Sequence, residues 1–176
     1  MNAPQPIHHD MLLEFTGGED DGAREQYLSF LLGDEEYAVD ILKVQEIKGW
    51  SGVTPIPNCA DYVKGVINLR GTIVPVVDLR LRFGLPASEY GPLTVVIVLR
   101  IVGGGRGRIM GVVVDAVADV HNLPVEELKP PPTFGASVDT EYLRGLATVE
   151  ERMLILLDID RLLSSGELAV GDEGGG

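Results

Sequence analysis

The sequence predicts a mainly β protein, and three observations indicate this fold class. Strand-length apolar runs recur along the chain, separated by Gly and Pro, which have 22 and 11 copies among 176 residues. Helical patterns are scarce and short. A segment that begins near residue 62 is repeated near residue 142, which is typical of two copies of one small β unit.

Two hairpins are predicted from turn signals between apolar runs. YLSFLL (27–32) is rich in strand formers, GDEE is a turn signal, and YAVDI (37–41) resumes the strand pattern. The second hairpin runs from TVVIVLRI (94–101) through the glycine-rich stretch 103–107 into RIMGVVVDAV (108–117). Both hairpins favour small barrels or sandwiches over a helical domain.

Helix is predicted at three places only. A turn or two is expected at 58–64 and another at 79–84. A C-terminal helix is expected to follow Asp158, whose side chain suits an N-cap.

The internal repeat has an offset of 80 residues. YVKGVINLRGTIVPVVDL begins at Tyr62, and YLRGLATVEERMLILLDI begins at Tyr142. The aligned pairs include Gly65 with Gly145, Ile73 with Met153, and Asp78 with Asp158. Proline-rich stretches precede both copies. Each half, at about 65–70 residues, has too little core to be stable alone, so we expect the halves to pack together with a groove at their seam.

The net charge of −13 argues against nucleic acid as a partner, because binding to phosphate needs a basic surface. Residues 1–26 and 164–176 carry eight of these negative charges, so we interpret both ends as flexible acidic tails. The longest apolar runs, 94–99 and 153–157, are far shorter than the roughly 20 residues of a membrane helix. With no signal-peptide pattern and a single Cys59, the expected compartment is the cytoplasm.

No catalytic, metal or cofactor site is predicted. The histidines are interpreted as surface residues: His8, His9 and His121. Cys59 has no orienting His nearby in sequence and is interpreted as a small packed thiol. GGGRGR lacks the spacing of a phosphate-binding loop and is interpreted as a hairpin tip. Asp78 and Asp158 suit caps of the following turns better than acid–base chemistry.

Arg70 lies in the middle of the apolar run 65–79, where an unpaired charge is costly. Strand alternation places Val44 and Glu46 on one face and Gln45 and Ile47 on the other, so Glu46 could face Arg70 from a neighbouring strand. A half-buried pair that holds strand geometry and a direct role in recognition are compatible, and both stay open.

Phe134 follows three prolines in a predicted loop. A hydrophobic anchor on an exposed connection suggests a binding residue, and packing beneath its own loop is the alternative.

The sequence resembles the CheW-like domain family of bacterial chemotaxis. The resemblance rests on LLGDEEYAVDILKVQEIKGW, YVKGVINLRGTIVPVVDLR, TVVIVL, GVVVDAVADV and TEYLRGLATVEERMLILLDIDRLL. It implies two intertwined five-stranded SH3-like barrels around a shared hydrophobic interior, with a short C-terminal helix. The expected organisation is a tail at 1–26, one domain at 27–168 with exchangeable strands in subdomains of roughly 27–90 and 91–163, and a tail at 169–176.

The resemblance also implies an adaptor function without catalysis. Such a protein joins the cytoplasmic tips of methyl-accepting chemotaxis receptors to the histidine kinase CheA in membrane-associated arrays, with no cofactor, membrane insertion or small-molecule substrate. The implied receptor-binding residues, in a groove between the barrels, are Val44, Glu46, Gly65, Arg70, Val117 and Val120. Lys129 and Phe134 are the implied kinase-binding residues of the second barrel, and a hydrophobic face of the first barrel is a second kinase patch.

Two alternatives stay open. A CheW-like scaffold could serve a non-chemotactic system, such as one that controls pilus motility or a second messenger. An enzyme with its active site in the cleft would need converging titratable groups, and the inferred groove offers one Glu and one Arg among valines.

Overall fold

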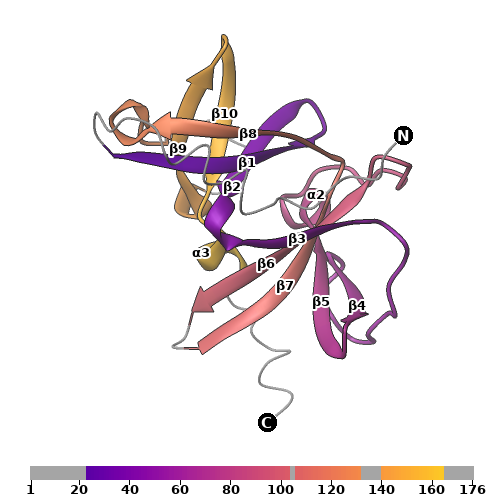
Figure 1. Ribbon diagram of the computed structural model, residues 1–176. Coiled ribbons are helices and arrows are strands. Elements are labelled where there is room, and N and C mark those ends of the chain that lie inside the picture. Colours follow the sequence, from indigo (N-terminus) through magenta and orange to yellow (C-terminus); the bar gives the residue numbers. More distant parts are fainter. Residues whose placement is uncertain (1–22, 104–105, 132–139, 165–176) are drawn as a thin grey trace.

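The computed structural model describes residues 23–103, 106–131 and 140–164, which form two five-stranded sheets (Figure 1). Sheet A has the strand order β8-β1-β2-β10-β9, and sheet B has the order β3-β6-β7-β5-β4. The strands are β1 (Arg24–Leu32), β2 (Glu35–Asp40), β3 (Val44–Gly49), β4 (Val63–Leu69), β5 (Thr72–Asp78), β6 (Val95–Gly103), β7 (Arg106–Val114), β8 (Ala116–Pro124), β9 (Leu143–Val149) and β10 (Arg152–Leu157). The helices are η1 (Ile41–Lys43), α2 (Leu79–Arg82), η2 (Val125–Glu127), η3 (Thr140–Tyr142) and α3 (Ile159–Leu163).

The mainly β prediction, with two five-stranded units and a short C-terminal helix, is confirmed. Both predicted hairpins form, as β1–β2 and β6–β7. The helices expected at 79–84 and after Asp158 are α2 and α3, each with the preceding aspartate as N-cap. The helix expected at 58–64 is wrong. Asn58 has φ 57°, which a right-handed helix excludes, and Val63 N–H closes a single turn onto the Ala60 carbonyl before β4 begins.

Each sheet contains strands from the sequence before residue 90 and from the sequence after it. Sheet A combines β1 and β2 with β8, β9 and β10, whereas sheet B combines β3, β4 and β5 with β6 and β7. The pairs β2–β10 and β5–β7 are parallel, and the other neighbours are antiparallel. The two halves of the sequence are therefore joined by main-chain hydrogen bonds.

The apolar runs are nearly continuous because most strands bury both faces. Along β6, Val95, Ile97 and Leu99 point into a core that both sheets share, whereas Val96 and Val98 point into a core inside sheet B. A third core lies inside sheet A around Tyr27, and other members are Ala38, Leu123, Ala147, Leu154 and Leu156. Successive side chains of a strand point to opposite faces, so a strand with a core on each face has apolar residues at successive positions.

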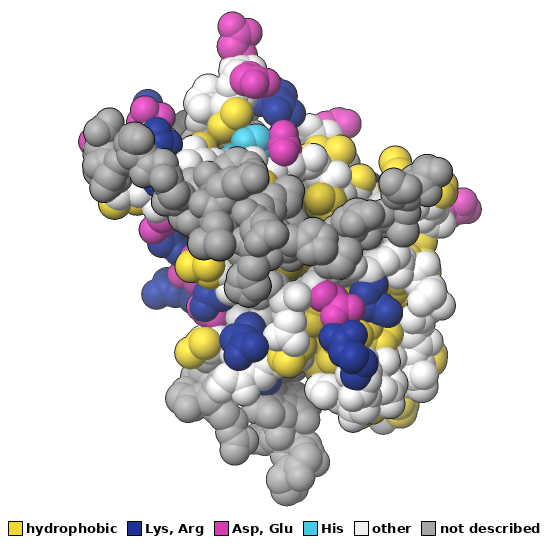
Figure 2. Space-filling view, in the orientation of Figure 1, with side chains coloured by type: hydrophobic (Ala, Val, Ile, Leu, Met, Phe, Trp, Pro, Cys, Tyr) yellow, Lys and Arg dark blue, Asp and Glu magenta, His cyan; other side chains and the backbone are white. Residues whose placement is uncertain are grey.

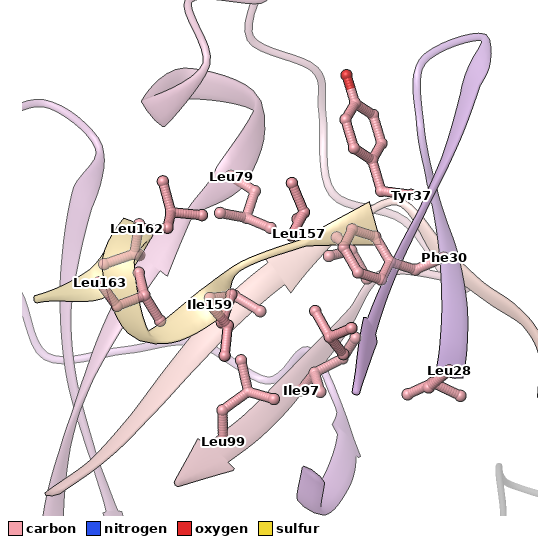
Figure 3. Packing of buried hydrophobic residues seen from close by; sticks show 14 of the residues in the cluster. Leu28, Phe30, Tyr37, Leu79, Ile97, Leu99, Leu157, Ile159, Leu162 and Leu163 are labelled. Carbon is pink, nitrogen blue, oxygen red and sulfur yellow. The ribbon is translucent and has the colours of Figure 1, made fainter. Parts of the chain in front are cut away.

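The shared core holds the sheets together (Figure 3). Leu28 and Phe30 come from β1, and Ile97 and Leu99 come from β6, so both sheets contribute. Leu79 of α2 and the α3 side chains Ile159, Leu162 and Leu163 fill the space between them. Neither sheet alone covers these residues, so they are buried only when the two sheets pack together.

The repeat is visible as two copies of a hairpin followed by a helix, β4–β5–α2 and β9–β10–α3. An isolated bridge joins Thr54 to Val66 in the first copy, and another joins Lys129 to Leu146 in the second. A Cβ on Gly65 would overlap the Thr54 carbonyl, and one on Gly145 would lie 2.8 Å from the Lys129 carbonyl oxygen. The shared glycine therefore allows a second backbone to approach the hairpin. Both sheets are open in their strand orders, so full barrel closure stays a prediction.

The prediction of a surface histidine is wrong for His121. This residue lies within β8, where it pairs with Tyr27 of β1, and is 9% exposed. Its Nε2 lies 3.3 Å from the Ser29 hydroxyl and 3.6 Å from Glu36 Oε2. His8 and His9 lie outside the described residues. Within those residues, no helix is long and apolar enough to cross a membrane.

Candidate functional site

Arg70 lies at the tip of the β4–β5 hairpin. Arg70 and Gly71 are the two residues between paired Leu69 and Thr72, with φ values of 52° and 90°. Positive φ at both central positions is what a type I′ turn requires, and this turn matches the twist of the flanking strands. The Arg70 charge therefore lies on an exposed turn and not inside the buried part of the run.

The Arg70 side chain forms the predicted pair with Glu46. Its Nη2 donates to Glu46 Oε1 at 2.5 Å, and this hydrogen bond and the Glu46 charge raise the pKa of Arg70. The Arg70 side chain is 69% exposed and that of Glu46 is 22% exposed, so the guanidinium remains in water. Glu46 is on β3 and Arg70 follows β4, the two outer strands of sheet B. The pair thus links opposite edges of the sheet.

The predicted alternation along β3 is interrupted by a bulge. Val44 pairs with Leu99 and Glu46 pairs with Val98, so Gln45 is the extra residue. Val44 and Ile47 consequently both pack against the shared core, although alternation assigned them to opposite faces. A one-residue insertion reverses the faces of all later side chains, and no composition signal marks it in this sequence.

Val44, Val117 and Val120 are half-buried and pack at the border of the shared core. Val44 comes from sheet B, whereas Val117 and Val120 come from β8 of sheet A. We call these three valines, with Glu46 and Arg70, the inter-sheet surface. On the face in Figure 2, yellow hydrophobic side chains lie beside charged ones over sheet B. Partly exposed apolar groups beside a fixed ion pair suit protein contact.

Gly65 has a structural explanation of its own. It is buried in β4 with φ 147°, and the Thr54 carbonyl lies where a Cβ would be. A side chain there would separate the Thr54–Val66 bridge. A direct contact of Gly65 with a partner stays a prediction.

Lys129 is exposed in the second repeat, beside the bridge to Leu146. It lies next to a shallow hollow of about 390 Å³, whose other lining residues are Leu123, Glu126, Glu127, Leu128, Ala147 and Thr148. Phe134 lies outside the described residues. The kinase-binding assignments of both residues stay predictions.

Asp78 and Asp158 each lie directly before a helix. Asp78 accepts hydrogen bonds from Arg80 N–H and Leu81 N–H, and Asp158 accepts one from Arg161 N–H, so both cap helices as predicted. Among residues 23–103, 106–131 and 140–164, no cluster of three His, Cys, Asp or Glu side chains could hold a metal ion. Cys59 is exposed, with its thiol near the Ile56 carbonyl, so the expected packing of this thiol is wrong.

Sequence reasoning missed a contact between the repeats. The guanidinium of Arg82 lies 5.2 Å from the ring centre of Tyr62 and 5.0 Å from that of Tyr142. These tyrosines are equivalent residues of the two copies, and such cation–π contacts are favourable within about 6 Å. The equivalence of the tyrosines was visible in the sequence, but the cation between them was not.

Comparison with known proteins identifies the family. A family model described as CheW-like domain matches residues 26–167. The chain belongs to the CheW-like domain family. A relative named chemotaxis protein CheW, from Klebsiella aerogenes, is 52% identical to this CheW-like chain over 148 residues, which cover 84% of this chain and 87% of the relative. A chemotaxis protein CheW of Rhizobium meliloti is 37% identical over 146 residues, which cover 83% and 91%.

A solved structure has the same fold as this CheW-like chain. The scaffolding protein TtCheW from Thermoanaerobacter tengcongensis superposes with a TM-score of 0.74 at 29% identity, covering 85% of this chain and 94% of the other. The resemblance noted from the sequence is therefore confirmed. Chemotaxis and scaffolding are the functional class of this CheW-like chain.

Proposed function

We propose that this chain is a non-enzymatic adaptor that couples methyl-accepting chemotaxis receptors to the histidine kinase CheA. The observation that carries the proposal is the inter-sheet surface, in which half-buried valines from both sheets pack against the shared core and β3 also carries Glu46 with its partner Arg70. Membership in a family of chemotaxis and scaffolding proteins supports it. Binding requires no cofactor, and receptor control of kinase activity follows from holding both proteins together.

The inter-sheet surface is the proposed receptor site. A receptor tip in this family is a helical hairpin bundle, whose apolar face would cover Val44, Val117 and Val120. The Glu46–Arg70 pair would fix the orientation of the helix, because polar groups at a rim give register more than affinity. Gly65 would contribute by keeping β4 close to the 54–55 segment.

The proposed kinase site is separate. Lys129 and Phe134 are the kinase-contacting residues that we assign to the second repeat. The exposed apolar side chains of sheet B supply candidates for the other patch, since Ile73 is 58% exposed and Leu93, at the entry to β6, is 70% exposed. Separate surfaces allow one chain in the cytoplasm to hold receptor and kinase simultaneously, which raises their effective concentration in membrane-associated arrays.

Co-sedimentation with receptor-containing membranes tests the receptor site. Val117→Asp places a charge where the receptor helix would pack, so we expect it to reduce co-sedimentation at least tenfold while CheA binding in solution is kept. Val125→Asp is the matched control, because Val125 is 38% exposed on η2 and outside the inter-sheet surface. Equal co-sedimentation of Val117→Asp and wild type would contradict the assignment.

A further inference from the structure

Along the described residues the chain passes from one sheet to the other at two places. The first crossover is η1 (Ile41–Lys43), between β2 of sheet A and β3 of sheet B. The second crossover is Asp115, between β7 of sheet B and β8 of sheet A. Each crossover leads directly to a valine of the inter-sheet surface, Val44 in the first case and Val117 in the second.

An ion pair to α3 holds the first crossover. Lys43 Nζ donates to Asp160 Oδ2 at 2.6 Å, and Asp160 Oδ1 accepts the Val102 N–H at 2.8 Å. Asp160 belongs to the helix that follows β10 of sheet A, and Val102 belongs to β6 of sheet B. The Asp160 carboxylate of α3, which follows sheet A, therefore binds both Lys43 of the first crossover and the main chain of β6 in sheet B.

An ion pair to α2 holds the second crossover. Arg80 Nη1 donates to Asp115 Oδ2 at 2.7 Å, and the Gly33 N–H donates to the same oxygen at 2.8 Å. Arg80 Nε donates to the Pro86 carbonyl at 2.9 Å, which fixes the plane of the guanidinium. Gly33 is in the β1–β2 turn of sheet A, whereas Arg80 follows β5 of sheet B.

The two ion pairs are related by the internal repeat. Arg80 and Asp160 are separated by the 80-residue offset, and each is the second residue of its helix. The charges are reversed between copies, so each helix residue meets a crossover residue of opposite sign. The four side chains are 16% to 33% exposed, which screens them from water more than a typical surface pair.

We infer that Lys43–Asp160 and Arg80–Asp115 are positioning pairs that set the places of Val44 and Val117 on the inter-sheet surface. The inference rests on the proposed receptor site and adds residues that do not themselves line it. Lys43 is the residue immediately before Val44, and Asp115 is two residues before Val117. A shift of either crossover therefore moves a contact residue. A displacement of about 1 Å is enough to weaken a packed interface.

The test combines receptor binding with a local probe of the valines. Lys43→Met and Asp115→Asn remove one charge from each pair, while the amide introduced by Asp115→Asn keeps an oxygen for the Gly33 N–H. We expect each variant to bind receptor membranes about five- to tenfold more weakly and to shift the methyl NMR signal of the valine beside it. Lys43→Arg should bind receptor membranes as wild type does, because it keeps the positive charge.

Arg152→Met is the control, because it removes one charge of the Arg152–Glu36 pair of 2.8 Å between β10 and β2 of sheet A, and both residues lie outside the two crossovers. It should bind receptor as wild type does. Wild-type affinity in both Lys43→Met and Asp115→Asn would overturn the inference, as would weaker binding with unchanged valine signals. The proposed function would stand in either case if Val117→Asp still reduced receptor co-sedimentation at least tenfold, and it would fall if wild type itself failed to bind.

Discussion

The guanidinium of Arg70 connects the two outer strands of sheet B at a position where the main chain turns. A two-residue loop with positive φ places the side chain in solvent, and Glu46 fixes its direction. An exposed pair of this kind contributes little to stability, so we expect its main effect on receptor binding, through the orientation of two charges at the border of the apolar surface.

Reversal of the Arg70 charge separates recognition from stability. Arg70→Glu places two carboxylates together, and we expect receptor co-sedimentation to fall at least tenfold while the melting temperature changes by no more than about 2 °C. The swapped double variant, Arg70→Glu with Glu46→Arg, restores the pair with its charges exchanged. Recovery of binding in the double variant would show that the pair acts structurally and would contradict a direct contact of Arg70 with receptor.

Gly65→Ala is expected to destabilise the fold. The added Cβ meets the Thr54 carbonyl and φ 147° is strained for alanine, so we expect a loss of more than about 2 kcal/mol in urea unfolding. Gly49→Ala is the control, because nothing lies within 4 Å of its Cβ position. Equal stability of the two variants would mean that the 54–55 segment moves away from β4 without cost.

Among the secondary-structure elements, features set by neighbouring residues could be predicted from the sequence, whereas features set by distant strands could not. The β1–β2 and β6–β7 hairpins and the helices capped by Asp78 and Asp158 could be predicted, because turn residues and caps act within a few positions. The parallel pairing of β2 with β10 depends on residues more than 100 positions apart. The bulge at Gln45 and the burial of His121 depend likewise on partner strands, which one sequence does not reveal.

A buried residue of β6 and an exposed residue shortly before this strand predict a sharp contrast in stability. Leu99 is fully buried in the shared core, so Leu99→Ala should cost about 2–5 kcal/mol in urea unfolding. Leu93→Ala, at a residue that is 70% exposed, should change stability by less than about 0.5 kcal/mol. A small loss in Leu99→Ala would show that the sheets do not depend on the shared core.

Tyr90, in the segment between α2 and β6, leads us to expect that the free energy of unfolding depends on pH in the alkaline range. Tyr90 packs edge-on against Trp50 with 4.4 Å between ring centres, and its hydroxyl donates to the buried Asp78 carboxylate. Burial is the main cause that raises the pKa of Tyr90 above its ordinary value of 10.0, and this hydrogen bond is the second cause. The unfolded chain therefore loses its proton first, and the stabilisation is present below pH 10 and lost as the pH rises towards the folded value.

We expect the free energy of unfolding to fall between about pH 9 and about pH 11. Tyr90→Phe removes this titration, so its stability should fall less steeply over the same range. Tyr27 also has a raised pKa, through burial and its hydrogen bond to Glu25, and it retains part of the slope in that variant. Identical slopes for wild type and Tyr90→Phe would contradict the assignment.

At the scale of the whole molecule, each sheet contains strands from both halves of the chain, and the two sheets share one hydrophobic core. For the proposed adaptor, this connected core would hold two partners at a defined separation. The receptor assignment could be inferred from the sequence through its resemblance. The ion pairs Lys43–Asp160 and Arg80–Asp115 could not be predicted, because ion pairs between distant segments have no local pattern.

The amount of CheA that sediments with receptor membranes, measured against increasing concentrations of this chain, tests the adaptor function most directly. A protein with one site for each partner gives a curve that rises and then falls, because excess adaptor occupies receptor and kinase separately. Val117→Asp should remove the rise. A CheA signal that is independent of the chain, or that rises to a plateau and stays there at large excess, would contradict the account.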